Sequence, residues 1–285
     1  YSRMAQHVHL LTTSGISLPT DLWLPVTKTF APPISDQVAL GTAINLPKDL
    51  TLTVEGFYKT MENLIEYKEG ATFVGSSTDW ESKVEKGRGW SYGLEMMLEK
   101  TVGKTTGWLA YTLSWSQRQF ENLNFGRMFP AKYDSRHDIS IALTHTFNKR
   151  IDMGATWVFN TGNAVTLGTR EYIGADVPSG NDNLHGRPYI TEYQGRNNYR
   201  MPPYHRMDWG INFHKQKKHG VRTWNISIYN VYSRQNAFVL TWDTKREMHT
   251  IVQDGREIRV MGDKTILKKF SLYPIIPSFS YSYKF

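Results

Sequence analysis

The last eight residues, Ser278-Phe279-Ser280-Tyr281-Ser282-Tyr283-Lys284-Phe285, alternate polar and aromatic side chains up to the carboxyl terminus. Successive side chains of a β-strand point to opposite faces, so this stretch predicts a strand with four rings on one face and Ser or Lys on the other. Rings at the end of a strand are typical of the aromatic belt of a membrane β-barrel, where lipid meets water. An edge strand of a soluble all-β domain has the same alternation, so the choice rests on the rest of the chain.

The composition of the chain removes several classes of protein. It has 285 residues, a formal net charge of +8 and no cysteine. Without an apolar run near the roughly 18 residues that a spanning helix needs, a helical membrane protein is excluded. Without cysteine there is neither a disulfide framework nor a thiolate metal site. Lys and Arg are scattered along the chain rather than massed, so we expect no nucleic-acid partner.

Alternation with period two recurs along the whole chain and indicates an all-β protein. The strands that it predicts, before the terminal one, are 3–11, 38–44, 51–58 (continuing past Tyr67), 90–99, 109–116, 139–144, 152–160, 206–213 and 224–229. The region 14–33 contains three separate proline sites and is therefore predicted to be a long loop and not a strand. The ninth strand is expected to run toward Phe238, with a further loop or strand extension leading to Lys269.

Short and long connections alternate between these ten strands. The short turns are 45–49, 102–107, 147–150 and 215–220, and the long loops are 14–33, 70–87, 119–136, 161–203 and the stretch before the terminal strand. If the short turns lie at one end of the sheet, every long loop lies at the other. This sorting is typical of an antiparallel transmembrane β-barrel with short periplasmic turns and long extracellular loops. A soluble sandwich has no reason to sort its loops in this way.

Several motifs carry a resemblance to a known family. They are the stretches 14–25, 33–37, 87–95 (Gly-Arg-Gly-Trp-Ser-Tyr-Gly-Leu-Glu), 200–208 (Arg-Met-Pro-Pro-Tyr-His-Arg-Met-Asp) and 230–236, and the final Phe285. As a set they resemble the carboxyl-terminal part of a TonB-dependent outer-membrane receptor of the Bacteroidetes type. The resemblance implies a barrel of about 22 strands, closed by a plug domain. We therefore expect residues 1–285 to be the carboxyl-terminal part of one barrel domain, with the plug domain and the amino-terminal strands absent from this chain.

The resemblance also implies a function and partners. The function is TonB-dependent uptake of a scarce nutrient, such as a siderophore, haem, a vitamin or a glycan, across the outer membrane of a Gram-negative cell. The expected partners are outer-membrane lipid and lipopolysaccharide, the plug and remaining strands of the same receptor, periplasmic TonB and a surface lipoprotein. The barrel makes no covalent change to its ligand, so we expect no enzyme activity, cofactor or metal. The alternative is an autonomous ten-stranded outer-membrane enzyme or passive pore.

The predicted loops supply the candidate ligand-binding residues. Aromatic rings stack on planar or sugar ligands and guanidinium groups pair with anions. The candidates are Trp80, Arg127, Phe129, Tyr133, Tyr189, Tyr193, Arg196, Tyr199 and Trp242. The alternative is that these rings pack the loops against one another. On the polar face of the strands, Glu95, Glu99 and Asp208 avoid lipid, and we expect them to form ion pairs, for example with Arg206 or Lys59.

Overall fold

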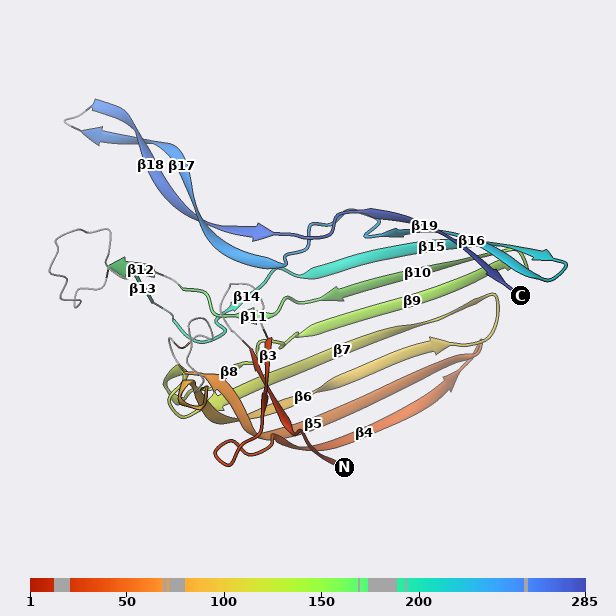
Figure 1. Ribbon diagram of the computed structural model, residues 1–285, viewed down its shortest axis with the longest axis horizontal. Coiled ribbons are helices and arrows are strands. Elements are labelled where there is room, and N and C mark those ends of the chain that lie inside the picture. The colour runs from red at the N-terminus through yellow and green to blue at the C-terminus, as the bar shows by residue number, and fades with distance from the viewer. Residues whose placement is uncertain are drawn as a thin grey trace.

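One large antiparallel sheet dominates the computed structural model (Figure 1). The structure describes residues 1–12, 21–68, 71, 80–168, 170–173, 189–192, 194–253 and 256–285. The sheet has eleven strands in the order β1-β4-β5-β6-β7-β9-β10-β15-β16-β19, with β8 paired to β7. Within the described residues there is no helix long and apolar enough to cross a membrane. The all-β, antiparallel prediction is confirmed.

The strands of this sheet follow the sequence periodicity closely. Their bounds are β1 (Ser2–Ala5), β4 (Ile34–Leu46), β5 (Leu50–Tyr67), β6 (Val84–Lys100), β7 (Thr105–Phe120), β8 (Phe129–Pro130), β9 (His137–Asn148), β10 (Ile151–Asn160), β15 (Tyr204–Lys217), β16 (Gly220–Tyr229) and β19 (Ile276–Lys284). The short turns β4–β5, β6–β7, β9–β10 and β15–β16 all lie at one end of the sheet, which we call the turn end, at the right of Figure 1. The long connections leave from the opposite end, the loop end. The predicted sorting of the connections is confirmed.

Smaller two-stranded pieces extend the loop end. They are β2 (Val8–Thr12) with β3 (Asp21–Pro25), β11 (Ala164–Val165) with β14 (Tyr199–Arg200), β12 (Arg170–Ile173) with β13 (Tyr189–Glu192), and β17 (Val239–Gln253) with β18 (Arg256–Phe270). Two 3-10 turns, η1 (Glu81–Lys83) and η2 (Asn124–Gly126), complete the described elements. The β17–β18 hairpin projects beyond the sheet at the upper left of Figure 1.

Three predicted boundaries are wrong. Residues 3–11 form two strands, because β2 leaves the sheet to pair with β3. β3 itself lies in the region predicted to have no strand. Pro25 is tolerated there because it is the last residue of β3, where no continuing ladder needs an N–H donor. The strand predicted to run toward Phe238 ends at Tyr229, and the extension after it is the β17–β18 hairpin.

The register separates an apolar face from a polar face. On the apolar face one row of directly paired residues crosses seven strands without a polar side chain: Ile44, Leu52, Leu98, Leu109, Ile141, Trp157 and Met207. A row on the polar face consists of Gly41, Glu55, Glu95, Thr112, Asp138, Asn160 and Tyr204. Two faces of such different chemistry are what a sheet between lipid and an aqueous lumen requires.

The apolar face has no protein packed on it in the described chain. Leu40 is 83% exposed, Ile226 is 43% exposed and Tyr281 is 52% exposed. The buried residues gather instead at the loop end. One cluster consists of Leu11, Leu24, Phe30, Ile65, Tyr67 and Val84, and a second of Phe120, Leu123 and Phe129. A soluble sandwich buries its apolar face against a second sheet, so this sheet is the wall of a membrane β-barrel and not half of a sandwich.

The described sheet is open at both edges. β1 covers β4 only from Ile34 to Gln37, and β19 pairs only with β16. The remaining edge of β4, from Val38 to Leu46, has no strand partner among the described residues.

Candidate functional site

A buried carboxylate, Glu66, joins the loop end of β5 to two distant segments. Its side chain is 3% exposed. Arg118 Nη1 donates to Glu66 Oε2 at 2.9 Å from β7, and Arg196 Nη2 donates to Oε1 at 3.3 Å from the segment before β14. A buried carboxylate is tolerated when cations and hydrogen bonds compensate its lost hydration. Glu66 therefore fixes the segment around Arg196 to the rim of the sheet.

Further contacts around Arg196 hold this segment in place. Its guanidinium lies 5.9 Å from the centroid of the Phe129 ring, and that ring stacks on Phe120 at 5.9 Å. Asn124 Oδ1 accepts from the Arg196 backbone N–H at 3.0 Å. Asn197 Nδ2 donates to the carbonyl oxygen of Pro130 at 2.7 Å. The connection before β14 is thus bound to the connection between β7 and β9.

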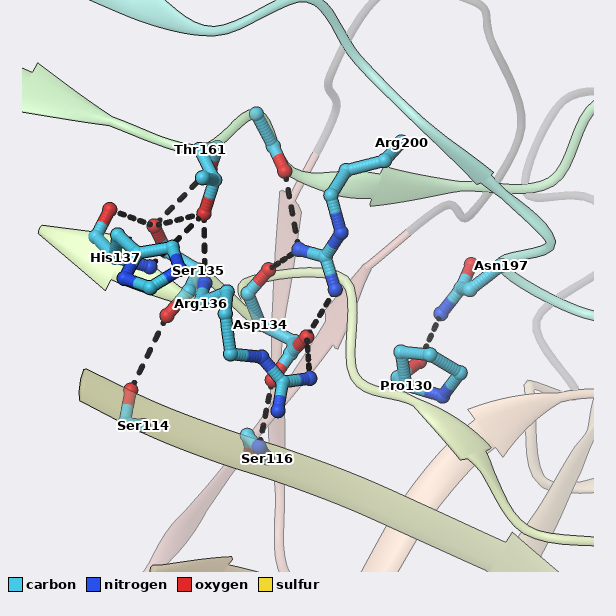
Figure 2. A network of polar contacts seen from close by, with 11 residues as sticks. Ser114, Ser116, Pro130, Asp134, Ser135, Arg136, His137, Thr161, Asn197 and Arg200 are labelled. Atoms are coloured by element: carbon cyan, nitrogen blue, oxygen red, sulfur yellow. Dashed lines mark hydrogen bonds and ion pairs between the residues drawn. The ribbon is translucent and has the colours of Figure 1, made fainter. Parts of the chain in front are cut away.

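A second buried carboxylate, Asp134, is also paired with two arginines (Figure 2). It is 2% exposed and accepts from the Ser116 backbone N–H at 2.7 Å. It forms ion pairs with Arg200 and, at 3.5 Å, with Arg136. The Arg136 guanidinium also lies 4.2 Å from the centroid of the Trp115 ring.

Thr161 completes the network of Figure 2. Its Oγ1 accepts from the backbone N–H groups of Arg136 at 2.7 Å and His137 at 3.1 Å. Ser135 Oγ donates to the Thr161 carbonyl oxygen at 3.0 Å, and Ser114 Oγ donates to that of Ser135 at 3.2 Å. The start of β9 and the end of β10 are therefore locked together at the loop end, and they form a rigid base for the longer connections.

An aromatic hollow lies on the polar face near this rim. Its volume is about 390 Å³, and its lining includes Tyr204, Arg206, Tyr229, Phe238 and Tyr273. Arg206 Nε donates to Asp208 at 2.9 Å, and its Nη1 donates to the hydroxyl oxygens of Tyr204 at 2.9 Å and Tyr229 at 2.8 Å. The predicted ion pair of Asp208 with Arg206 is confirmed. Rings around a fixed cation form a surface suited to a planar or sugar ligand with polar edges.

The structure places the predicted loop residues in three kinds of environment. Trp80 packs against Phe30, with ring centroids 5.3 Å apart. Phe129 is 2% exposed and Arg196 is 8% exposed. The structure brings these last two together, because the Arg196 guanidinium that pairs with Glu66 lies near the Phe129 ring. Trp80, Phe129 and Arg196 therefore pack the loops against one another, which is the alternative to ligand binding that the sequence left open.

The other predicted residues are exposed or half-buried, or they lie outside the described residues. Arg127 is exposed near Phe125, Tyr133 is exposed, and Trp242 is exposed on β17. Tyr199 is half-buried on β14. The side chain of Tyr189, which is on β13, and the whole of Tyr193 lie outside the described residues.

The hollow around Arg206 was not predicted from the sequence as a binding surface. Its residues come from β15, β16 and the segments that flank the β17–β18 hairpin. Tyr204 and Arg206 lie two residues apart on a strand and so share a face. This spacing was available in the sequence, but the approach of Phe238 and Tyr273 was not.

Comparison with known proteins adds solved structures at low identity. Neither a protein-family model nor a curated protein matches the chain. The chain is similar to the outer-membrane transporter YddB from Escherichia coli (14% identity, TM-score 0.49, 90% of this chain and 34% of that one). It is also similar to the ferric-catecholate import receptor Fiu from Escherichia coli (13%, 0.47, 90% and 29%). A third is the siderophore receptor PirA from Acinetobacter baumannii (13%, 0.35, 94% and 35%). The chain spans about a third of the length of these structures.

Proposed function

We propose that the chain forms part of the barrel wall of a TonB-dependent receptor, which takes up a scarce nutrient across the outer membrane of a Gram-negative cell. The observation that carries the proposal is the apolar row from Ile44 to Met207 on an uncovered face, together with connections sorted by length between the two ends of the sheet. The apolar face contacts lipid, with lipopolysaccharide toward the loop end. The polar face lines the lumen.

The open edges support further strands of the same receptor as partners. An unpaired strand edge in lipid costs several kcal/mol for each unsatisfied backbone group, because no water is present to satisfy it. The stretch from Val38 to Leu46 and the free side of β19 therefore pair with the remaining strands of a closed barrel of the Bacteroidetes type. In this proposal a plug domain fills the lumen, periplasmic TonB acts on it, and a surface lipoprotein approaches the loop end.

The proposed ligand contacts lie at the loop end. They are the hollow around Arg206 and the exposed side chains of Arg127, Tyr133 and Trp242, together with Tyr189, Tyr193 and Tyr199 on the connection between β10 and β15. The buried clamps around Glu66 and Asp134, which include Phe129 and Arg196, hold these connections in place. Siderophores, haem, vitamins and glycans all offer flat or polar surfaces that such rings and guanidinium groups contact.

Growth of a deletion strain tests this function. The strain is given, one at a time, a siderophore, haem, a vitamin or a glycan as the limiting nutrient, with and without a protonophore. We expect a growth defect on at least one nutrient, restored by the intact gene only while the proton gradient is present. Uptake that survives the protonophore would identify a passive pore and contradict the proposal.

A matched pair of variants tests the hollow. Tyr229→Ala removes a ring that contacts the Arg206 guanidinium, and we expect it to weaken ligand binding about tenfold, as loss of an aromatic anchor does. Tyr58→Ala removes an equal ring from the apolar face, where Tyr58 is 50% exposed, and we expect no change in binding.

One observation favours the alternative of an outer-membrane enzyme. On the polar face, His214 Nδ1 lies 2.8 Å from Thr223 Oγ1, and His214 Nε2 contacts Asp152. These are the residue types of a hydroxyl nucleophile, its base and an orienting carboxylate. Asp152 also accepts from Asn212 at 2.8 Å, and Asn212 accepts from Asn225 at 2.8 Å, as part of a polar ladder across the strands. If the native protein hydrolyses a chromogenic ester and Thr223→Val abolishes this activity, the result would favour an enzyme. If the native protein and the variant both show only the uncatalysed rate, the residues are structural members of the polar ladder.

A further inference from the structure

The turn end carries a group of cations without compensating carboxylates. Lys215 on β15 and Arg222 on β16 are direct cross-strand partners, and the next residue in their row is Tyr283. Like charges directly opposite each other destabilise a sheet. Neither side chain forms an ion pair with a carboxylate in the described part of the chain. A pair of this kind is stabilised if an anion lies between the two cations.

The Arg222 side chain itself points to a missing partner. Its Nε atom is shielded from water and makes no hydrogen bond to any described residue. The guanidinium lies 6.0 Å from the Trp224 ring centroid, so part of the side chain is held against the strand. A buried N–H without a partner is costly, and an anionic oxygen is the acceptor that a guanidinium prefers.

A hollow of about 640 Å³ lies at the same end of the sheet, where His214 and Gln216 alternate with Lys215 and face the polar side. It is lined by Lys149, Arg150, His214, Lys215, Gln216 and Val221. The backbone of the β9–β10 turn is fixed, because the Arg150 N–H donates to Asn148 Oδ1 at 2.8 Å and the His214 N–H donates to the Arg150 carbonyl oxygen at 2.7 Å. Lys149, Arg150 and Lys215 therefore border one preformed space, and in the described chain no carboxylate forms an ion pair with them.

The position of the cations indicates what the anion is. The row next to Lys215 and Arg222 on the apolar face is Ile151, Phe213, Trp224 and Tyr281. Aromatic rows mark the level where acyl chains meet headgroups, and cations just beyond them lie at the level of lipid phosphates. An anion between Lys215 and Arg222 therefore lies on the lipid-facing side of the sheet.

We infer that Lys215 and Arg222 bind the phosphate headgroup of an acidic phospholipid in the membrane leaflet at the turn end. This inference rests on the proposed membrane location but not on nutrient uptake. Each cation near an anionic surface contributes roughly a factor of five to affinity. The pair thus accounts for about a twenty-five-fold preference over a lipid without net charge.

Lipid retention by the intact protein tests the inference. The protein, extracted in an uncharged detergent, is offered an equal mixture of phosphatidylglycerol and phosphatidylcholine, and the retained lipids are counted by native mass spectrometry. We expect the native protein to retain phosphatidylglycerol preferentially and the double variant Lys215→Gln/Arg222→Gln to lose most of this preference. Lys264→Gln/Lys268→Gln removes the same charge from the β17–β18 hairpin and should leave the preference intact. Circular dichroism checks that both variants keep their strand content.

The remaining outcomes overturn the inference in distinguishable ways. Equal preference in the two double variants means that the cations act only through net charge. Displacement of phosphatidylglycerol by millimolar inorganic phosphate means that the two cations take free phosphate rather than a lipid headgroup. A protein that inserts into lipid but has no preference loses only this inference. A protein that fails to insert contradicts the membrane location as well, and with it the proposed function.

Discussion

Glu66 lies between two guanidinium groups whose own exposure differs. The Arg196 side chain is 6% exposed and that of Arg118 is 20% exposed. Removal of one charge from a buried pair leaves the other uncompensated and costs about 3–5 kcal/mol. Arg118 has more contact with water than Arg196, so we expect loss of the Glu66 charge to affect the segment around Arg196 more.

Glu66→Gln should release the segment around Arg196 while the strands stay paired. We expect the free energy of unfolding to fall by about 3 kcal/mol and the backbone amides of Arg196 and Asn197 to exchange hydrogen faster. Denaturant unfolding and hydrogen exchange measure the two effects. Glu62→Gln is the matched control, since Glu62 is exposed on the same strand. An equal loss of stability in both variants would contradict the clamp.

Glu247 on the β17–β18 hairpin provides a titration outside the sheet. Lys245 Nζ donates to its Oε1 at 2.8 Å, and this hydrogen bond, with the charges of Lys245 and Lys264, holds the pKa of Glu247 below its ordinary value of 4.5. A depressed carboxyl pKa stabilises the folded hairpin above the ordinary value, and the contribution is lost as pH falls through the lowered pKa. The pairing is therefore intact at neutral pH and is lost as the pH falls through a pKa that lies below 4.5.

Lys245→Gln should raise the pKa of Glu247 toward 4.5, because it removes the largest cause of the shift. The side-chain carboxyl carbon, followed by NMR as pH is lowered, reports the change. Lys269→Gln removes a cation of the same hairpin that donates instead to the Gln235 carbonyl oxygen, and it should leave the titration unchanged. A pKa of Glu247 that is the same in all three proteins would show that the hydrogen bond does not form.

At the scale of elements, the approach of β7 to β9 depends on a glycine. Gly107 has φ +145°, and a Cβ there would lie 2.1 Å from the Ala142 carbonyl oxygen and 2.9 Å from the Leu143 Cα. Both the backbone conformation and the contact disfavour any side chain. Gly107 is thus the point at which these two strands come close enough to pair.

Gly107→Ala should destabilise the β7–β9 pairing by roughly 2–4 kcal/mol, the sum of a positive-φ penalty and an overpacked contact. Gly103→Ala separates the penalty for positive φ from the penalty for the close contact. Its φ is +108°, but the nearest atom to an added Cβ is 3.8 Å away, so we expect a cost of only about 1 kcal/mol. Denaturant unfolding in detergent gives both values. Equal losses of stability in the two variants would mean that the backbone conformation alone determines the cost of a side chain.

The strands could be predicted from the sequence because their signal is local. Alternation within a few residues indicates a strand, and Pro or Gly marks its end. The bulge in β5 has no such signal. Its register shifts between Met61 and Leu64, where Asn63 has φ +55° and donates to the Pro32 carbonyl oxygen at 3.0 Å. That contact joins residues 31 positions apart.

The candidate site could be predicted only in its residue types. Rings and guanidinium groups on the loops indicated binding surfaces, yet Arg196 reaches Glu66 across 130 positions of sequence. Whether a loop arginine faces solvent or closes on a buried carboxylate depends on how distant loops meet. Alternation along one strand carries no information on that. The hollow around Arg206 was missed for the same reason, since two of its walls come from segments that flank a projecting hairpin.

At the scale of the whole molecule, a charge introduced by mutation should be tolerated differently on the two faces of the sheet. Ile226 lies on the apolar face between Ile211 and Phe279, and the next residue, Ser227, lies on the polar face between Gly210 and Ser278. In a barrel wall the first faces acyl chains and the second an aqueous lumen. In a soluble domain with a buried polar network the order of tolerance would be reversed.

Ile226→Lys should therefore impair folding into lipid by about 2–4 kcal/mol near the bilayer centre, because a charge there loses its hydration. Ser227→Lys, one position away on the same strand, keeps its charge in water and should fold almost as well as the native protein. Refolding into lipid vesicles, followed by urea titration, compares the two directly. Leu143→Lys, on the apolar face of β9, should repeat the result for Ile226. Equal tolerance of lysine on both faces would mean that lipid does not cover the apolar face, and the importer proposal would then lose its physical basis.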